Sequence, residues 1–262
     1  MAADRITSAR NNVTSHFNMI ELYTWSTPNG RKVSIMLEEC GLPYRVHKIN
    51  IGTNSEQFAP EYLRINPNGK IPSIVDPDGP DGKAMAMMES GAILIYLAGK
   101  TGRLLPRSVR GKYVALQWLM FQMGGVGPMF GQAHHFMRAK KDEIPYGSER
   151  YGKEAKRLYG VMDAHLGAHE HFADEYSIAD IAIYPWVARH EWHRVELAEF
   201  PHVKRWYDAV GARPAVQRGM AVRKPNGARA PRRASRSRPA SRGARRSRPR
   251  GCGCGPPAAR SR

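Results

Sequence analysis

Cysteine is scarce in this chain. Its 262 residues include three cysteines, two of which, Cys252 and Cys254, lie near the C-terminus. Only Cys40 belongs to the part of the sequence with an ordinary globular composition, so a disulfide framework that stabilises the fold is excluded. This usage is typical of a reducing compartment, and we expect a cytoplasmic protein.

Long hydrophobic runs are missing as well. No stretch approaches the run of about 18 consecutive apolar residues that indicates a transmembrane helix. Residues 1–18 are polar and lack the apolar core of a secretory signal, and we expect them to form a flexible extension. The sequence therefore predicts a protein without a membrane partner.

The segment 227–262 lacks acidic, aromatic and branched aliphatic residues. It holds 12 of the 41 basic residues and none of the 23 acidic ones, so most of the net charge of +18 comes from it. It cannot bury enough apolar surface to fold, which predicts a disordered basic tail. Three interpretations stay open: an unselected extension such as out-of-frame translation would give, nucleic-acid contact through the arginines, or redox or metal use of Cys252 and Cys254.

Residues 19–101 alternate between strand and helix patterns. Their order predicts β-α-β-α-β-β-α, which is that of a thioredoxin-like α/β domain. Strands are expected at 20–25, 44–51, 71–75 and 84–88, and helices at 32–40, 60–65 and 90–100.

Residues 108–226 show helical patterns instead, which predicts an all-α C-terminal domain. The glycine-rich run 124–128 is expected to interrupt the first helix, and an amphipathic helix is expected over 151–169. Ser177 and Asp180 have the spacing of a capping box before another apolar helix.

Two short segments could together clamp a small peptide. Pro72 stands at the start of an apolar strand. A cis peptide bond there would leave the backbone N–H and C=O of the neighbouring residue accessible to a ligand. Ser90 is a suitable N-cap, and a helix start favours a carboxylate, while Glu89 beside it could pair with an α-ammonium. The pair could hold the zwitterionic head of an amino acid, although an ordinary capped β–α turn would look the same.

From Ile20 to about Val222 the chain resembles the cytosolic glutathione transferases. The segments Asn-Pro-Asn-Gly-Lys-Ile-Pro at 66–72 and Glu-Ser-Gly-Ala-Ile at 89–93 are similar to the whole superfamily. Other segments resemble one bacterial branch, the Nu-class or glutathione-dependent disulfide-bond oxidoreductases. These are 22–33, 116–136 and 148–151.

The resemblance implies a homodimer that binds glutathione, with one or two molecules or the disulfide per subunit and no metal. Pro72 and its neighbour would hold the cysteinyl backbone, and the acid and serine at 89–90 the γ-glutamyl group. Gln57 and Lys70 would reach the glycyl end, and Arg150 a second glutathione. By motif position the glutathione-binding residues are Gln57, Lys70, Ile71, Pro72, Glu89, Ser90 and Arg150.

Catalysis is expected at Thr27 and Asn29. A free thiol has a pKa of about 8.5, so an enzyme that uses the glutathione sulfur must favour the thiolate. Donors at a helix N-terminus can do so, and both residues lie in the turn before the predicted helix. The turn has no cysteine, and Cys40 would lie roughly 15 Å away at the far end of that helix. If the enzyme exchanges disulfides, as the resemblance to this branch implies, bound glutathione would supply the attacking thiolate and a second glutathione would resolve the mixed disulfide.

Two other functions stay open. In a transferase that conjugates glutathione to small electrophiles, Ser26 or Thr27 would be the activating hydroxyl. A non-enzymatic interaction module would instead use the basic tail to bind nucleic acid.

Histidine pairs at 165/169 and 190/193 have metal-ligand spacing, but no further cysteine or carboxylate completes either set, so no metal site is predicted.

Overall fold

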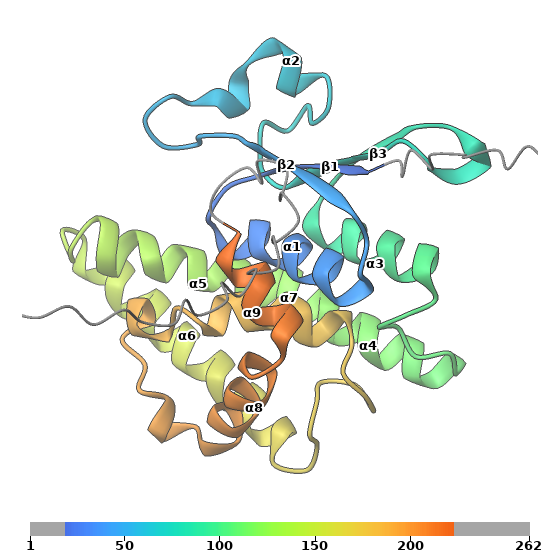
Figure 1. The fold of residues 1–262 in the computed structure, drawn as a ribbon. Helices are drawn as coiled ribbons and strands as arrows, with labels where there is room; N and C mark the ends of the chain where they lie inside the picture. Colours follow the sequence, from blue (N-terminus) through green and yellow to red (C-terminus); the bar gives the residue numbers. More distant parts are fainter. Residues whose placement is uncertain (1–18, 223–262) are drawn as a thin grey trace, which may run out of the picture. The chain divides into compact units, whose positions relative to one another are not determined.

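The computed structural model describes residues 19–222, so the predictions for residues 1–18 and for the basic tail lie outside the described part. Within it, the thioredoxin-like order of elements is confirmed (Figure 1). The strands are β1 (Ile20–Thr24), β2 (Tyr44–Lys48), β3 (Ser73–Asp76) and β4 (Met85–Met88). The helices between and after them are α1 (Pro28–Cys40), α2 (Pro60–Leu63) and α3 (Ser90–Thr101).

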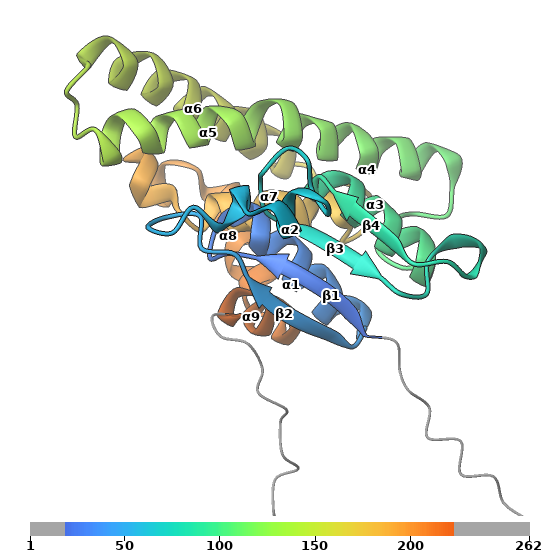
Figure 2. The same cartoon turned by 90° about the horizontal axis from the view of Figure 1, so that it is seen from above.

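The strands form one sheet in the order β2-β1-β3-β4. Strand β1 runs parallel to β2 and antiparallel to β3, with Leu22 opposite Val46 and Ile74. Alternate residues of β1 are buried, as expected for a strand whose one face packs on helices. Those helices are α1 and α3, whereas α2 lies on the other side of the sheet (Figures 1 and 2).

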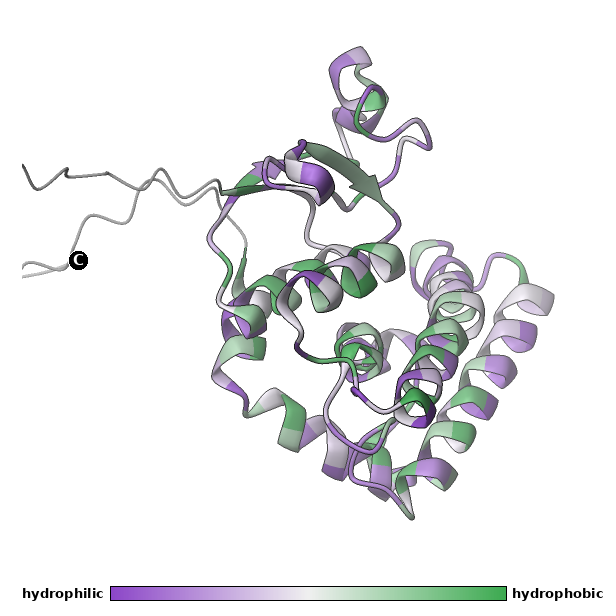
Figure 3. Ribbon diagram, turned by 90° about the vertical axis from the view of Figure 1, so that its right-hand side faces the viewer, coloured by the Kyte–Doolittle hydropathy of each residue, from purple (hydrophilic) through white to green (hydrophobic). Residues whose placement is uncertain are grey.

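The second part of the described chain is helical, as predicted. Hydrophobic residues gather in its interior and hydrophilic ones on its outward faces (Figure 3). No helix among residues 19–222 is long and apolar enough to cross a membrane. The helices are α4 (Val109–Phe121), α5 (Gly127–Ala133), α6 (Pro145–Leu166), α7 (Ile178–Val187), α8 (Pro201–Gly211) and α9 (Pro214–Ala221).

The predicted interruption at 124–128 is wrong. A π-helical turn, Gln122–Val126, joins α4 to α5 without a break in the helical path. A proline clashes with the carbonyl four residues earlier in an α-helix, and the wider π turn ahead of Pro128 accommodates this. A second π turn, His134–Ala139, follows α5. Helix α6 also begins at Pro145, earlier than the predicted residue 151.

The predicted capping box is confirmed at the start of α7. Ser177 Oγ accepts a hydrogen bond from the Ala179 backbone N–H at 3.2 Å, and Asp180 Oδ2 accepts one from the Ser177 N–H at 2.9 Å. The other oxygen of the same carboxylate accepts from the Trp206 indole at 2.8 Å and from the Phe172 N–H at 3.2 Å. Asp180 is fully buried, and every residue of α7 is buried behind it.

Replacing Asp180 by alanine should destabilise the protein by about 2–4 kcal/mol, because it leaves several buried donors without an acceptor. Urea unfolding followed by circular dichroism measures the change. Asp208→Ala is the control, since that carboxylate pairs with Lys204 at the surface and should cost less than about 0.5 kcal/mol. Equal losses in the two variants would contradict the role given to the buried carboxylate.

Candidate functional site

Thr27 is the N-cap of helix α1. Its hydroxyl oxygen accepts from the Gly30 backbone N–H at 3.2 Å, and Pro28 occupies the first helical position, where it needs no N–H. Because the cap uses the hydroxyl only as an acceptor, its proton remains free to donate. A side chain at Gly30 would collide with the Trp25 carbonyl, so the turn is closely packed.

Asn29 is held by the helical part of the chain. Its Oδ1 accepts from the indole Nε1 of Trp186, in α7, at 3.2 Å. An indole can only donate, so this contact fixes which end of the amide is oxygen and leaves its NH₂ as a donor elsewhere. Arg189, just beyond α7, donates to the Ser26 carbonyl at 2.9 Å. Helix α7 thus orients the turn that carries both predicted catalytic residues.

The loop before β3 presents backbone at the predicted cysteinyl position. The Ile71–Pro72 bond is cis and Pro72 is buried. The amide of Asn66 ties the loop together by donating to the Lys70 carbonyl at 2.7 Å and to Ser73 Oγ at 3.1 Å. Pairing of β3 with β1 begins at Ser73, so the backbone of Ile71 lies outside the ladder.

The start of α3 differs from the prediction by one residue. Glu89, not Ser90, is the N-cap residue, and Ser90 is the first residue of the helix. Glu89 has φ of 66°, a left-handed conformation that is uncommon for a residue with a side chain and is found at ligand-binding turns. Its side chain is exposed, whereas Ser90 is buried and turned toward α1.

The three remaining predicted residues lie in different surroundings. Gln57 is in a short 3₁₀ helix (Glu56–Phe58), and its side-chain oxygen is buried without a hydrogen-bond partner among residues 19–222. Lys70 is exposed beside the cis-proline loop. Arg150 lies on α6 and lines a groove of about 550 Å³ with Met129 and Arg157. The structure thus places Arg150 in a groove that neither Thr27 nor Asn29 lines.

Sequence reasoning missed Lys32, which lies beneath the predicted γ-glutamyl site. The side chain is fully buried, and its ammonium donates to Ser90 Oγ at 3.2 Å and to Gln122 Oε1. Burial lowers the pKa of Lys32 to about 7, against the opposing effect of the Glu89 charge. A basic pair, Arg31-Lys32, is usually found on a solvent-exposed helix face, so no local signal indicated this contact.

Two histidines pack near Trp186, whose ring centroid lies 5.8 Å from that of His134. The rings of His134 and His193 stack with centroids 4.6 Å apart, and His193 Nδ1 contacts the Tyr159 hydroxyl at 3.1 Å. Burial, followed by the charges of Arg189 and Arg138, lowers the pKa of His134 to about 4. Burial lowers the pKa of His193 as well, so both rings are neutral near pH 7.

The predicted histidine pairs do not assemble a metal site in the part of the chain that the structure describes. The rings of His165 and His169 stack at 4.2 Å, and His190 Nδ1 contacts the Val195 carbonyl at 2.8 Å. Across residues 19–222, no three histidine, cysteine or acidic side chains are grouped so that they could hold an ion.

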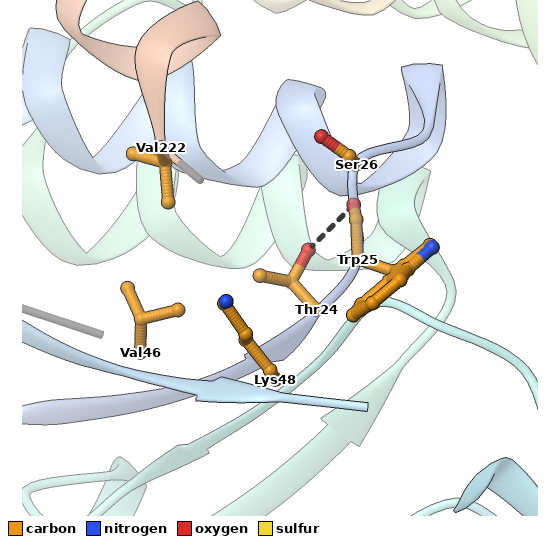
Figure 4. A pocket seen from close by; sticks show the side chains of 6 residues that line it. All are labelled: Thr24, Trp25, Ser26, Val46, Lys48 and Val222. Atoms are coloured by element: carbon orange, nitrogen blue, oxygen red, sulfur yellow. Dashed lines mark hydrogen bonds between the residues drawn. The ribbon is translucent and has the colours of Figure 1, made fainter. Parts of the chain in front are cut away.

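A separate pocket of about 330 Å³ opens on the β2 side of the turn. Thr24 and Lys48 point toward it from the ends of β1 and β2 (Figure 4). Thr27 and Asn29 do not line it, although Ser26, the alternative activating hydroxyl of a transferase, does. Its lining residues are Thr24, Trp25, Ser26, Val46, Lys48 and Val222.

Two family models match the chain. The model for the glutathione S-transferase N-terminal domain matches residues 27–100, and that for the C-terminal domain matches residues 130–214. The disulfide-bond oxidoreductase YfcG of Escherichia coli is 48% identical over 204 residues, which cover 77% of this chain and 94% of that protein. The resemblance found in the sequence is thereby confirmed.

Solved structures show the same likeness. A glutathione transferase from Pseudomonas putida, with one glutathione disulfide bound per subunit, is 47% identical, with a TM-score of 0.76. The match covers 80% of this chain and 94% of that one. A transferase from Burkholderia graminis, with two glutathione molecules per subunit, is also 47% identical, with a TM-score of 0.74 and coverage of 85% and 92%.

The neutral histidine pair should make the protein sensitive to mild acid. The unfolded chain gains a proton on His134 near pH 6.5, whereas the folded chain gains it only near pH 4, so stability falls as pH drops through this window. His134→Phe keeps the stacked ring and should give a shallower loss of unfolding free energy between pH 7 and pH 4.5. His135→Phe, at the exposed neighbouring position, is the control, and parallel profiles for wild type and His134→Phe would refute the assignment.

Proposed function

We propose that this chain, which belongs to the glutathione S-transferase family, is a glutathione-dependent disulfide-bond oxidoreductase. One observation carries the proposal: the N-terminus of α1 offers a hydroxyl and an oriented amide, from Thr27 and Asn29, and no thiol. A protein without a cysteine at this turn must take its attacking sulfur from the ligand.

The turn favours a thiolate without any proton acceptor. The hydroxyl proton of Thr27, the NH₂ of Asn29 and the positive end of the α1 dipole all lie at the start of the same helix. Hydrogen bonds to the charged form of a group lower its pKa, so a sulfur held here would ionise more readily than free glutathione. Cys40, at the other end of α1, has its pKa raised by burial and contacts Thr101.

The reaction is two successive thiol–disulfide exchanges. The bound glutathione thiolate attacks one sulfur of a small disulfide, forms a new S–S bond and expels the other half as a thiolate, which takes a proton from water. A second glutathione thiolate then attacks the glutathione sulfur of the mixed disulfide and releases the remaining half. Two glutathiones are oxidised to glutathione disulfide, and the substrate disulfide is reduced to two thiols.

The remaining predicted residues would hold the ligand. Glu89 and the start of α3 would take the α-ammonium and α-carboxylate of the γ-glutamyl group, and the backbone of Ile71 would take the cysteinyl part. Arg150 would bind the second glutathione. Two neighbouring structures hold glutathione or its disulfide, which supports this use of the same fold.

The assembly we propose is a homodimer in a reducing compartment, the cytoplasm, where reduced glutathione persists. Two exposed apolar features of the described surface, a single aromatic side chain and a stripe along one helix, support self-association. Phe58 is 59% exposed on the thioredoxin-like part, and Val109, Tyr113 and Met120 form an exposed stripe along α4. Each region could cover the other on a partner related by two-fold symmetry.

Asn29→Ala should reduce glutathione-dependent reduction of hydroxyethyl disulfide about 100-fold in kcat/KM, because it removes one donor to the thiolate. Trp186→Phe should lose about tenfold, since the amide is no longer held in one orientation. Trp118→Phe, which alters another indole in the helical part, is the control. Conjugation of a chloro-nitroaromatic is assayed in parallel, and conjugation that far exceeds reduction would favour the transferase alternative instead.

Phe58→Glu should convert the dimer to a monomer, because it places a charge in an apolar contact. Sedimentation velocity measures the mass. Tyr146→Glu is the control at another exposed aromatic residue, on α6, and it should leave the dimer intact. An unchanged mass for Phe58→Glu would exclude this surface from the interface.

A further inference from the structure

We propose that Lys32 is a positioning residue of the γ-glutamyl end of the glutathione site. The inference rests on the proposed function and adds a buried counter-charge to it. Lys32 comes from α1, the same helix whose N-terminus carries Thr27 and Asn29, so one helix serves both the thiol end and the amino-acid end of the ligand.

The contacts of Lys32 set the direction of the Ser90 hydroxyl. Lys32 Nζ lies 3.2 Å from Ser90 Oγ and can only donate, so the serine oxygen accepts. The serine proton is then directed away from the lysine, and its acceptor among the described residues is Met123 Sδ at 3.8 Å. Ser90 is the first residue of α3, where the free backbone N–H groups favour an anion. A carboxylate bound there would compete with the Met123 sulfur, a weak acceptor, for the serine proton.

The charge of Lys32 is the second contribution. The groups that contact the Lys32 ammonium carry no negative charge that would neutralise it. They are Gln122, Ser90 and Met123, whose sulfur lies 3.4 Å from Nζ. Glu89 is the ionisable neighbour whose charge favours the ammonium. A ligand carboxylate at the start of α3 would neutralise the charge of the Lys32 ammonium. A ligand without a carboxylate would leave that buried charge without a counter-charge.

This arrangement has a defined dependence on pH. Burial lowers the pKa of Lys32 to about 7 in the protein alone, so the ammonium is present below pH 7 and is lost above it. A bound carboxylate stabilises the ammonium and raises that pKa. Affinity for the ligand should therefore be greatest below pH 7 and should fall as pH rises through the range between the free and bound values.

Lys32→Met tests the proposal, because methionine has a similar length and replacing a buried ion by an apolar side chain is often neutral or stabilising. The probe is S-methylglutathione, which has no thiol to ionise, measured by isothermal titration calorimetry at pH 6. Binding should weaken about 10- to 100-fold relative to wild type. Lys48→Met, at an exposed lysine by the separate pocket of Figure 4, should bind as wild type does.

A second ligand separates positioning from general damage to the site. In the analogue whose γ-glutamyl group is replaced by 4-aminobutyryl, the α-carboxylate is missing and the rest is kept. Wild type should discriminate strongly between the two ligands, and Lys32→Met should discriminate far less. Between pH 6 and pH 8 the affinity of wild type for S-methylglutathione should fall more steeply than that of the variant.

The outcomes are distinct. If wild type binds S-methylglutathione and Lys32→Met shows the same affinity, discrimination and pH profile, the role of Lys32 is overturned and the proposed function stands. If wild type does not bind S-methylglutathione, the proposed function fails and this inference fails with it. Thermal unfolding is measured for each variant, and Lys32→Gln, which keeps a polar group, provides the same comparison if the methionine variant does not fold.

Discussion

The structure depends on one buried carboxylate. Asp180 receives hydrogen bonds from the backbone of Ser177 and Phe172 and from the indole of Trp206, and so fixes the start of α7 inside the helical part. A buried acceptor that satisfies several donors specifies a single arrangement, since each donor would be costly to leave unpaired. Helix α7 is buried along its whole length, so its far end is also fixed, and there Trp186 orients Asn29.

Helix α1 is where the two parts of the described chain meet. Its N-terminus presents Thr27 and Asn29, and its buried face carries Lys32 to the start of α3 and to the π turn after α4. Near its C-terminal end, Glu39 pairs with Arg213 through two hydrogen bonds of 2.8 and 3.0 Å. Both parts therefore shape the predicted catalytic turn, and neither part alone determines the orientation of its donors.

The sequence predicted features that depend only on residues close together in the chain. The capping box at Ser177 follows from residue type and spacing within a few positions, and it is confirmed. The roles of Lys32 and Trp186 were not predicted, because their hydrogen-bond partners lie far away in the sequence. Gln122 is 90 positions from Lys32, and Asn29 is 157 positions from Trp186. The interruption predicted at 124–128 failed because helix-breaking rules assume α-type hydrogen bonds, which the π turn replaces.

Helix α9 has a consequence for the order in which the protein is made. It packs on α1, where a side chain at Gly219 would come within 2.5 Å of Ile35, and Ser34 donates to the Gly219 carbonyl at 2.7 Å. Synthesis delivers the thioredoxin-like part first, but one face of α1 stays uncovered until residues 214–221 have left the ribosome. The first domain to emerge is therefore among the last to complete its packing, and a chain truncated before α9 would expose that apolar face to chaperones and proteases.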